Sequence, residues 1–201
     1  CSTAAGKAVC HLVWAMNKEE CDAYLADALA GIPEDFSGKL LEVPVGTGVL
    51  TMPVYRSLPN ADVTCLDYST DMMRRAQAAA ARLKLSNVAF RRGDVGSLPY
   101  VDESFDAVLS LNGFHAFPDK EAAYRETFRV LKSGGTFCGC FYVKGECART
   151  DRLIRRVYEK AKFFTPPYET MESLEERLRG MYEGVRLTNV KSIASFVCRK
   201  G

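Results

Sequence analysis

The chain lacks the features that mark a membrane-spanning or secreted protein. No apolar run approaches the roughly 20 residues that a bilayer-spanning helix needs, and the N-terminal residues do not form a signal-peptide core. Charge of one sign is also lacking, because the net charge is only +2 over 201 residues and basic side chains alternate with carboxylates. This balance disfavours a nucleic-acid surface. We therefore expect a cytoplasmic protein without nucleic-acid partners or stable membrane insertion.

Metal-binding patterns are equally scarce. The chain has eight cysteines but no CxxC pair, and only two histidines, so the residues favour neither a zinc site nor a disulfide framework. Cys65 and Cys198 fall within apolar strand patterns, where a thiol packs as a small hydrophobic group. The sequence therefore predicts free, mostly buried cysteines.

Strand and helix patterns alternate along most of the chain. Asn17 and Glu20 have the spacing of a helix-capping box, and Gly134 and Gly135 are expected to end a later helix. Alternation at this spacing indicates βαβ units and a mostly parallel sheet, followed by a tight antiparallel hairpin. The predicted strands cover 39–44, 62–67, 88–92, 105–111 and 136–143, and the later helices cover 71–85, 120–132, 150–163 and 170–180. In the helix over 150–163, Ile154, Val157, Tyr158 and Ala161 are predicted to face inward.

Polar and glycine residues follow successive predicted strands. Gly46 and Gly48 come after the first strand, Asp67 ends the second, and Asp94 follows the third. Ligands of open α/β sheets bind beyond the carboxyl ends of the strands, where an acidic residue can accept hydrogen bonds from ribose hydroxyls. Each residue also has a purely structural interpretation, because glycines permit turns and acidic residues stabilise helix N-termini. Their coincidence at successive strand ends favours a nucleotide-like cofactor.

Four stretches together resemble the motifs of a known enzyme family. They are "LLEVPVGTG", "CLDYSTDMM", "RRGDVGSLPYVDESFDAVLSLNGFHAF" and "FRVLKSGG". The chain is similar over residues 38–143 to class I S-adenosylmethionine-dependent methyltransferases, particularly to the small stand-alone type that resembles the ubiquinone/menaquinone-biosynthesis enzymes. This resemblance implies an enzyme that transfers a methyl group from S-adenosyl-L-methionine to a small-molecule acceptor.

The resemblance also implies an α/β fold and a division of the chain. It implies a Rossmann-like, doubly wound sheet of seven strands in the order 3-2-1-4-5-7-6, with strand seven antiparallel. We expect one domain over 1–201, working as a monomer or homodimer, with a helical lid and substrate segment at 1–37, a cofactor-binding core at 38–143, and helices and a β-hairpin at 144–201. The cofactor-binding positions that it implies are Glu42, Val43, Pro44, Val45, Gly46, Gly48, Asp67, Tyr68, Met72, Gly93, Asp94, Val95, Leu111 and Asn112.

Pro44 departs from the family pattern, because it occupies the position of the first loop glycine. Proline fixes φ near −65° and has no N–H group to donate to a cofactor carboxylate. We expect φ at this position to be negative, so that the proline stiffens the exit from the strand.

The acceptor is expected to contact aromatic residues near the ends of the fourth and fifth strands. Trp14, Phe114, His115 and Tyr142 are the candidate substrate residues, and an apolar aromatic wall suits a small organic molecule. His115 is the candidate catalytic base, with an ordinary pocket-lining histidine as the alternative.

Two other functions remain open from the sequence. One is a module that binds S-adenosylmethionine without turnover. The other is an NAD-dependent oxidoreductase, although Thr51 stands where its GxGxxG fingerprint needs a third glycine.

Overall fold

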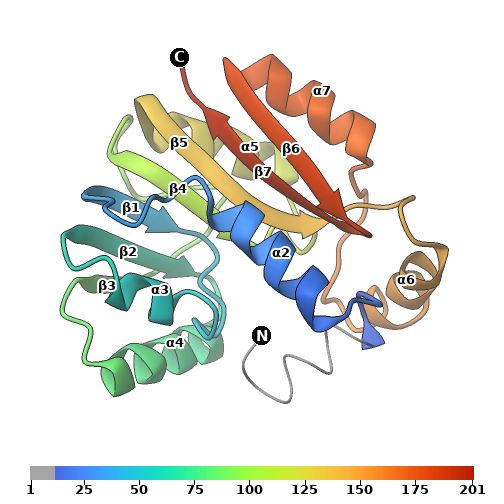
Figure 1. The fold of residues 1–201 in the computed structure, drawn as a ribbon, viewed down its shortest axis with the longest axis horizontal. Coiled ribbons are helices and arrows are strands. Elements are labelled where there is room, and N and C mark those ends of the chain that lie inside the picture. Colours follow the sequence, from blue (N-terminus) through green and yellow to red (C-terminus); the bar gives the residue numbers. More distant parts are fainter. Residues whose placement is uncertain (1–11) are drawn as a thin grey trace.

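The computed structural model of the chain describes residues 12–201, which fold around one seven-stranded sheet (Figure 1). The strand order is β3-β2-β1-β4-β5-β7-β6, and β7 runs antiparallel to both neighbours while the other adjacent pairs are parallel. The predicted strand order and terminal hairpin are confirmed. Residues 1–11, the start of the expected N-terminal segment, lie outside the described residues. The strands are β1 (Gly38–Glu42), β2 (Ala61–Asp67), β3 (Val88–Arg92), β4 (Phe105–Leu111), β5 (Leu131–Tyr142), β6 (Gly184–Val190) and β7 (Ile193–Arg199).

Helices cover both faces of the sheet, because successive strand residues point to opposite faces. Leu40 of β1 packs in the core under α2, α3 and α4, whereas the adjacent Leu41 packs in the core under α5 and α7, and both leucines are fully buried. Within residues 12–201, no helix combines the length and apolar content that a membrane span requires. The helices are α2 (Lys18–Leu29), α3 (Met52–Arg56), α4 (Thr70–Leu83), α5 (Lys120–Val130), α6 (Ala148–Leu153), η1 (Ile154–Tyr158) and α7 (Met171–Met181).

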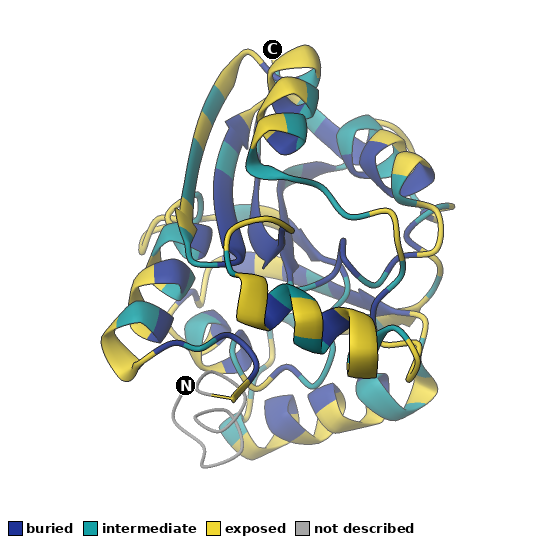
Figure 2. Cartoon of the chain, turned by 90° about the vertical axis from the view of Figure 1, so that its right-hand side faces the viewer, coloured by how far each residue is buried: buried dark blue, intermediate teal, exposed yellow. Residues whose placement is uncertain are grey.

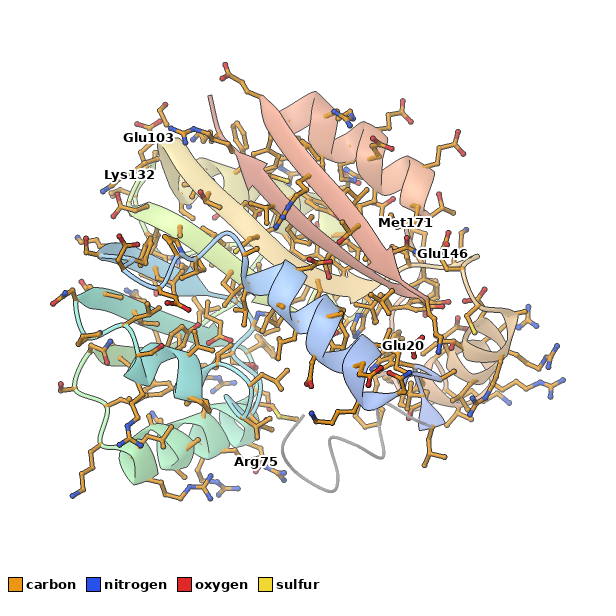
Figure 3. The ribbon with its side chains drawn as sticks, in the orientation of Figure 1. Glu20, Arg75, Glu103, Lys132, Glu146 and Met171 are labelled. Atoms are coloured by element: carbon orange, nitrogen blue, oxygen red, sulfur yellow. The ribbon has the colours of Figure 1, made fainter. Side chains whose placement is uncertain are left out.

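Helix α2 begins at the predicted capping box and lies against the C-terminal hairpin. The Asn17 side chain accepts the N–H of Glu20, and the Glu20 carboxylate accepts the N–H of Asn17, both at 2.8 Å. Lys191, in the turn between β6 and β7, donates to the same Glu20 carboxylate at 2.7 Å. Figure 3 labels Glu20 on α2. Ser195 of β7 donates to the carbonyl oxygen of Tyr24 at 3.0 Å. Contacts between residues that are far apart in the sequence therefore fix the position of α2.

Strand β5 starts earlier than predicted. Helix α5 ends at Val130, and Leu131 pairs at once with Phe105 of β4. Leu131 is fully buried in the core, and it belongs to the strand instead of extending the helix. The prediction that Gly134 and Gly135 end the helix was wrong, because both lie within β5, where its register with β4 shifts and Gly134 has a φ of +71°.

The helix predicted over 150–163 changes its geometry in the middle. The N–H of Glu159 donates to the carbonyl oxygen of Ile154 at 3.0 Å, so η1 is a π-helical turn, which is wider than an α-helical turn. Ile154 is fully buried as predicted. Val157 is 50% exposed and Ala161 is exposed, so their predicted inward orientation was wrong. The prediction assumed 3.6 residues per turn throughout. The wider π-helical turn rotates the residues that follow it, so that they face a different side of the helix.

We expect Gly139→Ala to destabilise the protein. Gly139 has a φ of +156°, and a Cβ there would lie 2.0 Å from the carbonyl oxygen of Ser110 in β4. Strain and overpacking together should lower the free energy of unfolding by roughly 3 kcal/mol. The matched control is Gly180→Ala in α7, where an added Cβ would meet nothing within 4 Å, and which should stabilise the protein by about 0.5–1 kcal/mol. Urea denaturation followed by circular dichroism measures both, and unchanged stability of Gly139→Ala would contradict the proposed strain.

Candidate functional site

The loop after β1 turns sharply through two glycines at the carboxyl edge of the sheet. Gly46 has a φ of +55° and Gly48 a φ of +66°, values that other residues adopt only with strain. The N–H of Val45 donates to the carbonyl oxygen of Leu66 in β2 at 2.9 Å, and this hydrogen bond holds the start of the loop beside that strand. The loop backbone therefore curves back over the ends of β1 and β2.

Pro44 packs against the loop that follows β4. The φ angle of Pro44 is not positive, which confirms the expected negative φ. The peptide bond between Val43 and Pro44 is cis. A Cβ at Gly113 would lie only 2.3 Å from Cδ of Pro44. The proline at the position of the family's first glycine is therefore matched by a glycine in the facing loop.

A cavity of about 210 Å³ opens between the ends of β1 and β4. Asn112 Oδ1, on a residue that lines it, is buried and has no hydrogen-bond partner, whereas the buried Thr51 hydroxyl lies beside the Glu42 carboxyl. An unpartnered buried amide oxygen suits a ligand that carries a hydrogen-bond donor. The cavity brings together seven of the predicted cofactor residues, namely Glu42, Pro44, Val45, Gly46, Gly48, Leu111 and Asn112, and adds Thr47, Val49, Leu50 and Thr51. The four additional residues belong to the same loop, so its continuity in sequence was the signal that could have found them.

Asp67 links the loop to the end of β2. One carboxylate oxygen accepts the N–H of Gly46 and the other accepts the N–H of Ser69, both at 2.8 Å. The side chain is almost fully buried, and this burial raises the pKa of the carboxyl above its ordinary value, while the backbone hydrogen bonds oppose the rise. Each carboxylate oxygen can accept a further hydrogen bond from a ligand.

The other predicted cofactor residues do not line the cavity. Tyr68 is 70% exposed, with the Arg92 guanidinium 5.7 Å from its ring centroid, and the N–H of Met72 is held by the Ser69 hydroxyl.

The residues that follow β3 lie beside the same strand end. The N–H of Gly93 donates to the carbonyl oxygen of Asp67 at 3.1 Å, and the exposed Asp94 accepts the N–H of Gly96 at 2.9 Å. Val95 is buried in the hydrophobic core, as is Val43.

Glu42 forms a buried wall of the cavity. It is 1% exposed and accepts hydrogen bonds from the Tyr55 hydroxyl at 2.9 Å and from the Cys65 thiol at 3.5 Å. Burial raises the pKa of Glu42 to about 8, although the hydrogen bond from Tyr55 opposes the rise. The carboxyl is therefore mostly protonated at neutral pH.

Aromatic rings gather beyond the ends of β4 and β5. The His115 ring stacks on Phe164 with 4.0 Å between centroids, and Trp14 stacks on Tyr142 at 6.3 Å. Trp14 also lies 6.4 Å from His115 and 6.1 Å from Phe164. These four residues form what we call the aromatic cluster, which contains three of the four predicted substrate residues.

Phe114, the fourth predicted substrate residue, lies elsewhere. Its fully buried ring packs 4.3 Å from Tyr124 and 5.4 Å from Phe141, in the core on the opposite face of the sheet. Adjacent residues 114 and 115 thus point into different environments.

His115 is held as a neutral imidazole. Its Nδ1 accepts the backbone N–H of Tyr142 at 3.3 Å, and burial lowers the pKa of the ring to about 3. With Nδ1 as the acceptor, the ring proton is assigned to Nε2. This arrangement offers a hydrogen-bond donor rather than a vacant basic nitrogen.

Comparison with known proteins is consistent with this geometry. Residues 40–135 match the family described as "Methyltransferase domain". A demethylmenaquinone methyltransferase of Deinococcus radiodurans is 35% identical over 113 residues, which cover 56% of this chain and 45% of that protein. A chloroplastic 2-methyl-6-phytyl-1,4-hydroquinone methyltransferase of rice is 35% identical over 100 residues, covering 50% of this chain and 29% of that protein. The chain therefore spans less than half the length of these two relatives.

The same sheet occurs in solved structures. A S-adenosylmethionine-dependent methyltransferase structure from Thermotoga maritima superimposes with a TM-score of 0.68 at 21% identity, covering 96% of this chain and 93% of that one. At this identity the likeness establishes the fold.

The buried Glu42 should make stability depend on pH. Between pH 4.5, its ordinary pKa, and about 8, the folded state holds a proton that the unfolded state releases. Stability should therefore fall as pH rises through this window, and Glu42→Gln should remove that dependence. We expect the parent protein to lose a few kcal/mol relative to Glu42→Gln between pH 5 and 8, measured by urea denaturation.

His115 acts in the opposite direction, since its lowered pKa adds stability as pH rises from about 3 to 6.5. Both proteins contain this residue, so its contribution cancels in the comparison. A difference between them that is constant from pH 5 to 8 would contradict the raised pKa of Glu42.

Proposed function

We propose that the chain carries a class I S-adenosylmethionine-dependent methyltransferase domain and that it methylates a small aromatic acceptor. The observation that carries the proposal is the cavity at the ends of β1 and β4, next to the aromatic cluster. Asn112 lines the cavity and His115 belongs to the cluster, so one short loop borders both. Two relatives are named for methylating menaquinone or hydroquinone compounds, which supports an acceptor of the aromatic-ring class.

The residues of the cavity fit the amino-acid end of S-adenosylmethionine. The unpartnered Asn112 Oδ1 is a natural acceptor for an ammonium group. An added Cβ at Gly46 would meet nothing within 4 Å, which leaves its backbone open to a ligand. Asp67 would hold the ribose hydroxyls with its remaining lone pairs, and we retain Tyr68, Met72, Gly93, Asp94 and Val95 as adenine-side candidates.

The aromatic cluster would hold the acceptor and exclude water. A planar acceptor could stack on rings already placed by mutual contacts, and the Tyr142 hydroxyl is fixed by donating to Asp151 at 2.8 Å. The bound cofactor supplies an activated methyl group. The protein's contribution is to align the acceptor with that group and to hold both in a dry site.

We expect cofactor binding to depend on Asp67. Asp67→Ala should weaken binding of S-adenosylhomocysteine by roughly 1–3 kcal/mol, or about 5- to 150-fold, because hydrogen bonds to a charged group are lost. Isothermal titration calorimetry measures this affinity. The matched control is Asp71→Ala, which removes an exposed carboxylate paired with Arg74 and Arg75. Equal affinities of the two variants would contradict the proposed role of Asp67.

The same titration, together with an assay of methyl transfer, separates the functional classes. The parent protein should bind S-adenosylmethionine and S-adenosylhomocysteine but not NAD. Binding of NAD alone would indicate an oxidoreductase, whereas cofactor binding without turnover of any hydroquinone acceptor would indicate a binding module.

We further propose that His115 is a neutral hydrogen-bond donor to the acceptor. His115→Gln keeps an N–H donor, whereas His115→Phe keeps an aromatic ring but has no donor. The Gln variant should therefore retain more turnover of a hydroquinone acceptor than the Phe variant. Turnover of the parent protein should show no ionisation from His115 between pH 6 and 8, because the pKa of this ring is lowered to about 3. A pH-rate step near 6.5 that both substitutions abolish would restore the role of catalytic base.

A further inference from the structure

Residues 149–163 carry an unusual concentration of positive charge. This basic segment contains six Arg or Lys residues and two acidic residues, a net charge of +4, whereas the whole chain has a net charge of +2. One of its two acidic residues, Asp151, is turned inward, where it accepts hydrogen bonds from Tyr142 and from the N–H of Gly145. The outer surface of the segment is therefore more basic than its composition suggests.

The cations of the basic segment have no anionic partners among the described residues. Elsewhere, arginines pair with carboxylates, as Arg129 does with Glu126 and Arg177 does with Glu169. No ion pair of the described chain involves a basic residue of the segment. All six are exposed, namely Arg149, Arg152, Arg155, Arg156, Lys160 and Lys162.

Apolar side chains lie exposed among these cations. Val157 is 50% exposed, Phe163 62% and the neighbouring Leu12 59%. They are three of the six large apolar residues that are exposed on the described chain. The π-helical turn contributes directly, because it leaves Val157 on the outer side. Figure 2, which views this side of the molecule, shows the helical segment with much of its surface exposed.

A shallow groove runs between the basic segment and residues 12–13. Its volume is about 500 Å³, and both apolar side chains and arginines line it, including Leu12, Val157, Arg152 and Arg156. Tyr158 at its inner side packs 5.6 Å from Phe164 of the aromatic cluster. The groove therefore leads from the basic surface toward the aromatic cluster.

We propose that the face formed by residues 12–13 and 149–163 docks on the surface of an anionic lipid bilayer. Unpaired arginines complement lipid phosphates and anionic headgroups, and the exposed apolar side chains complement the acyl boundary just beneath them. A nucleic acid would match the positive charge of this face. However, single strands bind by stacking their bases on aromatic rings, and the exposed aliphatic side chains of Leu12 and Val157 cannot stack in this way. The combination favours lipid.

Vesicle flotation tests the docking directly. The protein should float with vesicles of phosphatidylcholine containing about one-third phosphatidylglycerol, but not with phosphatidylcholine alone, and high salt should weaken the binding because it screens surface charges. Arg152→Glu combined with Arg156→Glu should reduce the affinity for anionic vesicles more than tenfold, since two attractive contacts become repulsive. Val157→Ser combined with Phe163→Ser should also weaken it while leaving the net charge unchanged.

The matched control reverses two exposed arginines outside the proposed face. Arg56→Glu combined with Arg82→Glu, on α3 and α4, changes the net charge equally and should leave flotation unchanged. Equal losses in the two charge-reversal variants would show a net-charge effect and overturn the proposal, as would an absence of flotation by the parent protein. Gel-shift binding to single-stranded RNA without flotation would overturn it in favour of nucleic acid.

This proposal stands apart from methyl transfer. Asp67→Ala, which should lose cofactor affinity, should still float with anionic vesicles, and the Arg152 and Arg156 variant should still bind S-adenosylhomocysteine. Failure of one proposal would therefore leave the other to be judged on its own measurement.

Discussion

The candidate site depends on how the buried carboxylate of Asp67 is satisfied. A carboxylate removed from water at the edge of a sheet requires hydrogen-bond donors, and here backbone N–H groups of Gly46 and Ser69 provide them. The first bond holds the glycine loop over the sheet, and the second links the carboxylate to the N-cap residue of α4. One side chain thus connects the glycine loop, which lines the cavity, to the start of α4.

The loops after β1 and β4 form a matched pair. Pro44 stiffens the first loop, and Gly113 in the second makes room for its ring. Asn112 precedes this contact and faces the cavity, whereas His115 follows it and enters the aromatic cluster. In the proposed function, this short stretch of backbone would set the distance between the cofactor and the acceptor.

Local patterns in the sequence predict much of the fold, because a parallel sheet buried on both faces imposes strong apolar runs and regular spacing. The strands at 88–92 and 105–111, the Asn17 cap and the strand-end positions of Gly46 and Asp67 all follow from such patterns. The start of β5 does not, because it depends on Leu131 pairing with a distant strand. Likewise, the π-helical turn and the separation of Phe114 from His115 depend on packing that residue types alone do not specify.

Helix α2 leaves the ribosome well before the hairpin that covers it, because more than 150 residues separate the two in the sequence. The hydrogen bond from Ser195 of β7 to Tyr24 and the ion pair between Lys191 and Glu20 each join residues more than 170 positions apart. During synthesis the apolar face of the helix therefore stays uncovered until the hairpin has left the ribosome. A nascent chain that stalls before β7 would therefore present this face to chaperones or to other unfinished chains.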